Sequence, residues 1–120
     1  MNELKLFLER MGALHDAVVL RLIWEPGSRI LRFEIDDLCS NFAGLPEYLG
    51  AVPGSIALKE VIRVEFDIDM SEGQLNVYEI FVDAASEDEW RVKMLFWPSG
   101  RIVVSCRAAE FPDVNLFGME

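Results

Sequence analysis

The sequence is poor in the residues from which most catalytic and metal sites are built. Its 120 residues include one histidine, His15, and two cysteines, Cys39 and Cys106. Neither cysteine lies in a Cys-x-x-Cys pair or at another spacing typical of metal ligands, and no Gly-x-Ser-x-Gly nucleophile motif occurs. We therefore expect two reduced thiols, no metal, no cofactor and no identifiable catalytic residue.

Basic residues and long apolar runs are also scarce. Eleven Lys and Arg against 21 Asp and Glu give a formal net charge of −10. Because phosphate groups bind to concentrated Lys and Arg, we expect neither nucleic acid nor an anionic membrane surface as a partner. No stretch approaches the roughly 20 apolar residues of a membrane-spanning helix, and the N-terminus does not read as a signal peptide. We expect a cytoplasmic protein whose charge suits a basic protein partner.

Hydrophobic residues are plentiful, at 52% of the chain, and this excludes general disorder. A chain of 120 residues can bury one core, so residues 1–120 are predicted to form a single domain. Leu4, Phe7, Leu8 and Met11 recur at helical spacing, which predicts a short amphipathic helix within residues 1–12.

After the helix, apolar and polar residues alternate in several runs. Residues 18–24 and 31–36 flank the turn signal Glu-Pro-Gly-Ser and predict a hairpin in which Phe33 alternates with charged neighbours. Further runs occupy residues 55–69, 74–84, 90–98 and 101–108. Because short loops force antiparallel pairing, we predict a mainly β (α+β) domain over residues 15–110. It would hold about six antiparallel strands in a curled sheet, sandwich or partly open barrel, with the helix packed on it.

Two finer expectations concern which residues face the core. In the run 55–69, the side chains expected to face inward are Ile62, Val64, Phe66 and Ile68. Several strands carry apolar residues on both faces, which predicts that the second face is covered by the helix, a loop or another subunit. Residues 111–120 show no clear period and are expected to form a tail.

The single histidine stands at the junction between helix and sheet. A neutral imidazole can act as a base, and a neighbouring carboxylate can orient it. Adjacent residues of an extended strand point to opposite faces, however, so Asp16 is predicted to be poorly placed to hold the ring of His15. Two interpretations remain. His15 is a boundary residue, or it stands with Cys39 and Tyr48 at the rim of a ligand-binding pocket under the apolar loop 39–54.

Carboxylates are concentrated in the middle of the chain. From residue 33 to residue 90 there are 14 acidic and two basic residues, and the run that follows carries Arg91, Lys93, Arg101 and Arg107. This asymmetry indicates an acidic and a basic region of the sheet, available for a protein partner or for self-association. The predicted partner-binding residues, expected on solvent-facing positions, are Asp36, Asp37, Glu65, Asp67 and Asp69.

The tetrapeptide Leu-His-Asp-Ala at residues 14–17, the hairpin after it and the later Phe-Trp-Pro-Ser-Gly-Arg segment resemble a set of small bacterial β-rich proteins of unassigned function. Some relatives of those proteins are described as immunity-like and neutralise toxins. The similarity covers most of the chain in pattern, with the tetrapeptide as its shared motif. It implies a bacterial cytoplasmic protein and carries no catalytic role to His15 or Asp16.

We therefore expect a small acidic, non-enzymatic protein-binding module of immunity-like type. Two alternatives stay open. One is an enzymatic or small-ligand-binding β domain with a pocket beside His15. The other is a structural homo-oligomeric subunit that pairs through a second apolar face.

Overall fold

The computed structural model describes residues 2–39, 51–69 and 73–112. Its helical elements are α1 (Asn2–Arg10) and the single 3-10 turn η1 (Gly12–Leu14). The strands are β1 (Val18–Glu25), β2 (Ile30–Ile35), β3 (Gly54–Lys59), β4 (Arg63–Asp67), β5 (Leu75–Ala84), β6 (Trp90–Trp97), β7 (Arg101–Cys106) and β8 (Ala108–Glu110). The mainly β, antiparallel architecture with one short helix is confirmed for these ranges, but the sheet has eight strands instead of about six. Within them, no helix has the length and apolarity needed to cross a membrane.

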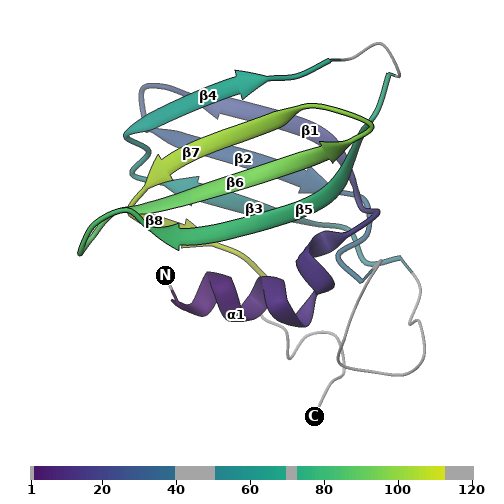
Figure 1. Cartoon of the computed structure of the whole chain (residues 1–120), viewed down its shortest axis with the longest axis horizontal. Coiled ribbons are helices and arrows are strands. Elements are labelled where there is room, and N and C mark those ends of the chain that lie inside the picture. Colours follow the sequence, from purple (N-terminus) through teal and green to yellow (C-terminus); the bar gives the residue numbers. More distant parts are fainter. Residues whose placement is uncertain (1, 40–50, 70–72, 113–120) are drawn as a thin grey trace.

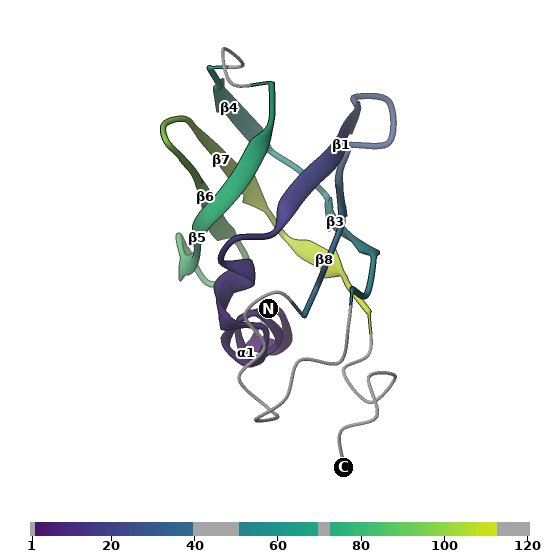
Figure 2. The same cartoon turned by 90° about the vertical axis from the view of Figure 1, so that its right-hand side faces the viewer.

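The strands form one antiparallel sheet that turns back on itself. Their order is β4-β7-β6-β5-β1-β2-β3-β8, so β4 and β8 are its two ends and the sheet is not closed. In the described part of the chain, β1 joins β5 through two residue pairs, Val18 with Asn76 and Val19 with Leu75. At this joint the sheet bends into two facing layers, β4-β7-β6-β5 and β1-β2-β3-β8 (Figures 1 and 2).

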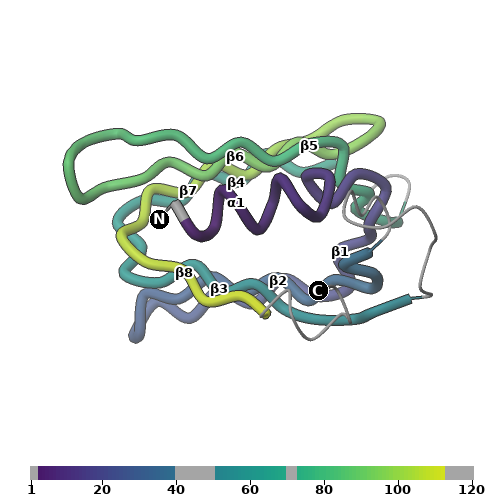
Figure 3. Tube along the Cα trace, turned by 90° about the horizontal axis from the view of Figure 1, so that it is seen from below, coloured from purple at the N-terminus to yellow at the C-terminus, as the bar shows by residue number. Residues whose placement is uncertain are grey.

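The hydrophobic core lies between the two layers and is covered on one side by α1. Alternate residues of β2 are fully buried, as the predicted hairpin required, and Phe33 is among them at 1% exposure. The apolar face of α1 is buried as well, and Phe7 packs on Phe111 just after β8, with ring centroids 4.9 Å apart. Seen from below, with α1 running across the view, the helix lies in the space between the layers, beside β5 and β8 (Figure 3).

The strand count differs from the prediction because the run 55–69 is two strands. Glu60 takes a left-handed conformation with φ 52°, and the chain there leaves one layer for the other. β3 pairs with β2 and β8, whereas β4 pairs with β7. The eighth strand, β8, lies at the end of the predicted sixth run and begins immediately after Arg107. Neither break carries the glycine or proline that usually signals a turn.

The side chains of residues 62–68 that are expected to face inward are only partly covered by the protein. Ile62 is 45% and Phe66 is 46% exposed, and Val64 is only partly buried. Phe66 pairs with buried Ile102 and therefore stands on the inward face, but β4 is the end of the sheet and has no further strand to cover it. Trp97 on the outer face of β6 is 62% exposed, so α1 does not cover that face there, and a cover by the loop 39–54 or by another subunit stays a prediction.

No described strand closes the side of the sandwich opposite α1. Among the described residues, β1 leaves β5 after Val19, and residues 20–25 of β1 pair with β2 alone. Figure 2 shows β4 and β1 at the end of the molecule opposite α1, one in each layer. We call the free edge of β4 together with residues 20–25 of β1 the open seam.

Candidate functional site

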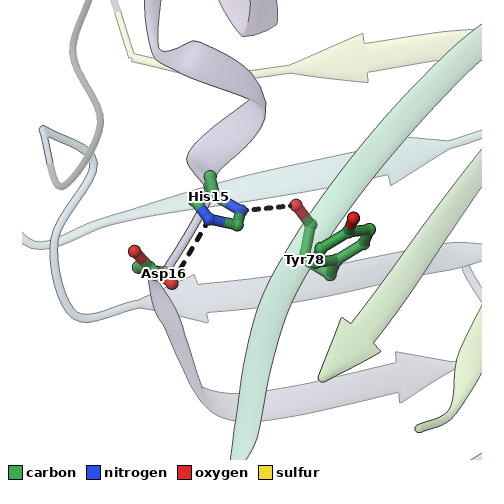
Figure 4. Close-up of polar contacts among 3 residues, drawn as sticks. All are labelled: His15, Asp16 and Tyr78. Atoms are coloured by element: carbon green, nitrogen blue, oxygen red, sulfur yellow. Dashed lines mark hydrogen bonds and ion pairs between the residues drawn. The ribbon is translucent and has the colours of Figure 1, made fainter. Parts of the chain in front are cut away.

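The imidazole of His15 contacts the backbone of β5 through Nδ1 and faces the neighbouring Asp16 carboxylate with Nε2. His15 follows η1, and its Nδ1 lies 2.8 Å from the backbone carbonyl oxygen of Tyr78 on β5. Its Nε2 lies 3.5 Å from Oδ1 of Asp16. The ring of Tyr78 stands edge-on to the imidazole at a centroid distance of 5.6 Å. Figure 4 shows the imidazole between the carboxylate of Asp16 and the strand that carries Tyr78.

The prediction that Asp16 is poorly placed beside His15 is wrong, because these residues are not in a strand. Asp16 has a φ of 72°, in the left-handed region, and this turn brings its carboxylate to the imidazole. The backbone on either side is tied to β5, since the Asp16 amide donates to the carbonyl of Val77 and the Val77 amide donates to that of Ala17. The contact between His15 and Asp16 thus comes from the geometry of a local turn, which the alternation of side chains along a strand does not describe.

This arrangement favours a positioning role for His15 over catalysis. A carbonyl oxygen only accepts, so Nδ1 must carry the proton donated to Tyr78. Nε2 then faces the Asp16 carboxylate, whereas a general base needs its lone pair directed at a substrate. Among the described residues, no group of three His, Cys, Asp or Glu side chains could hold a metal ion. His15 therefore fastens the junction between helix and sheet to β5.

Of the other two ligand-binding candidates, the structure describes only Cys39. Cys39 is buried and free, and burial together with the nearby Asp37 carboxylate raises its thiol pKa, which opposes a nucleophilic role. Tyr48 and most of the loop 39–54 lie outside the described residues. Cys106 is also buried and free, and desolvation raises its pKa from 9.0 to about 11.

The raised pKa of Cys106 predicts a loss of stability in alkali. The unfolded thiol ionises near pH 9.0 and the folded one near pH 11, so the folded state holds the proton more tightly. The resulting stabilisation is complete below pH 9.0 and is lost as the pH rises to 11. The free energy of unfolding, measured with denaturant at several pH values between 9.0 and 11, should therefore fall more steeply with pH for the natural protein than for Cys106→Val. Equal slopes would contradict the assignment.

Two of the predicted partner-binding carboxylates bind the protein's own backbone instead. Asp37 is 8% exposed, and its Oδ1 accepts hydrogen bonds from the amides of Cys39 at 3.0 Å and Val52 at 3.1 Å. Asp36 Oδ1 accepts from the amide of Val18 at 2.8 Å. The expected solvent-facing position is therefore wrong for Asp37. These carboxylates hold together the start of β1 and the two ends of the 39–54 loop.

Glu65, Asp67 and Asp69 are exposed, as predicted, but they do not form a separate acidic region. β4 is hydrogen-bonded to β7, and the register places Asp67 opposite Arg101. Glu65 forms an ion pair with Arg63 at 3.0 Å. On this face the carboxylates of β4 lie directly beside basic residues of β7, because these two strands pair although they are far apart in the sequence.

An apolar hollow of about 550 Å³ lies at one end of the open seam. It forms where β1 separates from β5, and its lining includes the side chains of Val18, Leu20, Leu22, Ile68 and Leu75. Leu20 sits at a bulge in the β1–β2 register and is 61% exposed. The hollow and the exposed edge of β4 were not predicted, because both depend on which strands become neighbours.

Comparison with known proteins places few constraints on function. No protein-family model and no curated protein matches the sequence. A solved structure of an uncharacterized protein from Neisseria gonorrhoeae matches with 10% sequence identity over 83% of this chain and 93% of that chain, at a TM-score of 0.49. The function of this chain must therefore follow from its own residues.

Proposed function

We propose that this chain is a non-enzymatic protein-binding module that takes an extended segment of a partner protein at the open seam. The observation that carries the proposal is the position of β4. It ends the sheet, its second edge meets no other described strand, and Phe66 and Ile62 beside that edge are nearly half exposed. An exposed strand edge with apolar side chains is a template for strand addition.

The seam offers both backbone and side-chain recognition. In the described part of the chain, no strand pairs with the second edge of β4 or with the second edge of residues 20–25 of β1, so both edges offer backbone N–H and C=O groups to an incoming strand. Leu22 and Trp24 on β1 pair with buried Phe33 and Leu31, so they stand on the inward face beside the seam. Every second residue of a bound segment would meet such apolar side chains, which gives specificity as well as affinity.

Charge at the seam supports a partner segment with basic residues. Asp67 and Asp69 stand at alternate positions at the end of β4, and Glu65, which is ion-paired with Arg63, precedes them in the same row. Basic side chains on the outward positions of the segment would face these carboxylates. Such pairs at the rim speed association and make it sensitive to salt.

The protein proposed here is a bacterial, cytoplasmic module of immunity-like type. The resemblance carried by the Leu-His-Asp-Ala tetrapeptide supports a bacterial, immunity-like module that binds a toxin. Two free cysteines support a cytoplasmic location. The engaged nitrogens of His15 and the buried thiols support a role without catalysis.

The proposal is tested by partner capture followed by hydrogen exchange. The immobilised protein is incubated with bacterial lysate at low salt, and each captured protein is purified and mixed with the free protein. We expect slowed amide exchange in residues 20–25 and 63–67. The double variant Ile62→Ala/Phe66→Ala should bind about tenfold or more weakly, since truncated aromatic anchors typically cost that much.

The matched control is Phe81→Ala/Trp97→Ala, which truncates two exposed apolar side chains away from the seam. It should bind the partner as the natural protein does. Protection confined to other strands, or equal weakening by both double variants, would overturn the seam as the binding site. Failure to capture any protein at low salt would count against a protein-binding function altogether.

A further inference from the structure

The outer face of β4, β7 and β6 holds a cationic hollow in an otherwise acidic protein. It measures about 380 Å³ and is lined by Arg63, Glu65, Arg91, Lys93, Arg101, Val103 and Ser105. The strand register explains why these residues meet. Arg91 lies opposite Ser105, which lies opposite Arg63, and in the next row Lys93 lies opposite Val103. Residues at paired positions share one face of a sheet, so the cations gather from three strands.

The charges lining this hollow are unbalanced. Four cations against the one carboxylate of Glu65 give the lining a net charge of +3, whereas the whole chain carries −10. The carboxylate of Glu65 forms an ion pair with Arg63, so these two charges offset each other. Within the described part of the chain, Arg91, Lys93 and Arg101 enter no salt bridge and no side-chain hydrogen bond.

Two carboxylates stand beside the hollow, but neither forms an ion pair with one of these three cations. Asp83 is the cross-strand partner of Arg91, and Asp67 is that of Arg101, but no salt bridge joins either pair. Like charges held close together on one sheet face repel each other. An anion bound among them would offset that repulsion, and a hollow whose lining carries a net positive charge concentrates anions.

We propose that this hollow is a binding site for a small, multiply charged oxyanion of the phosphate or polycarboxylate type. Arg91 and Arg101 present planar guanidinium groups that match two oxygens of such an anion, and Lys93 supplies a point charge between them. Ser105, at 9% exposure, offers a hydroxyl at the floor beside Val103. The volume falls within the range of small-ligand pockets. This site lies on the outer face of the sheet and does not depend on the open seam.

The test is a titration followed by backbone amide chemical shifts in the folded protein at low ionic strength. Pyrophosphate and citrate serve as the two probes, and binding of one alone assigns the phosphate or the carboxylate source. We expect saturable shifts concentrated in residues 91–93 and 101–105. Replacing two of the unpaired cations, in Lys93→Gln/Arg101→Gln, should raise the dissociation constant about tenfold or more.

The matched control is Arg107→Gln, which removes an exposed cation next to β7 that does not line the hollow. It should bind both probes as the natural protein does. Shifts that fail to saturate with either probe would overturn the proposal. So would equal weakening by the control and the double variant, because that result describes general attraction to the chain's positive charges.

Discussion

Replacing Phe33 with alanine should lower the free energy of unfolding by about 3–5 kcal/mol, the usual cost of deleting a fully buried phenyl ring. Phe33 is 1% exposed and lies in the middle of the β1-β2-β3 layer, opposite Leu22 and Ile56. Strands hydrogen-bonded on both sides cannot close around the lost ring, so a cavity stays between the layers. A domain of this size has a total stability of about 5–15 kcal/mol, so the substitution would remove a large part of it. Denaturant unfolding of the variant and of the natural protein measures the difference.

The matched control for this prediction is Phe81→Ala, which removes the same atoms from the outer face of β5. Phe81 is 40% exposed, and its loss should cost less than about 1 kcal/mol. Equal losses in the two variants would contradict a core that lies between the layers.

The spacing of apolar residues in the sequence predicts the first hairpin and the helix, two parts of the fold that depend on residues close together in the chain. Alternation around Phe33 and the Pro-Gly turn predicted the first hairpin, and the β1–β2 register confirms it. The spacing of Leu4, Phe7, Leu8 and Met11 predicted the buried face of α1. In both cases the period of the backbone and the period of the apolar residues coincide, which is why the sequence alone was sufficient.

The parts that sequence could not predict depend on contacts between distant segments. The turn at Glu60 divides one alternating run between two layers, and no glycine or proline marks it. β4 pairs with β7 across more than 30 positions, and this pairing alone brings Asp67 opposite Arg101. The contact between Asp16 and His15 likewise follows from a positive φ, which strand alternation does not describe.

Asp37→Ala should lower the free energy of unfolding by about 2–4 kcal/mol, because it leaves two poorly hydrated backbone N–H groups without an acceptor. A single oxygen, Oδ1 of Asp37, accepts from both Cys39 and Val52. Asp37→Asn keeps an acceptor oxygen at that position and removes the charge. It should therefore cost at most about half as much, as expected for neutral in place of charge-assisted hydrogen bonds.

The comparison with Asp67→Ala separates this structural role from the predicted role in partner binding. Asp67 is exposed on β4, and its loss should change stability by less than about 0.5 kcal/mol. Denaturant unfolding of Asp37→Ala, Asp37→Asn and Asp67→Ala should give their free energies of unfolding in increasing order, with Asp37→Ala the least stable. If Asp37→Ala unfolded like the natural protein but no longer captured a partner, the carboxylate would belong to the binding surface after all. Equal losses for Asp37→Asn and Asp37→Ala would show that charge, and not the position of one oxygen, holds the ends of the loop.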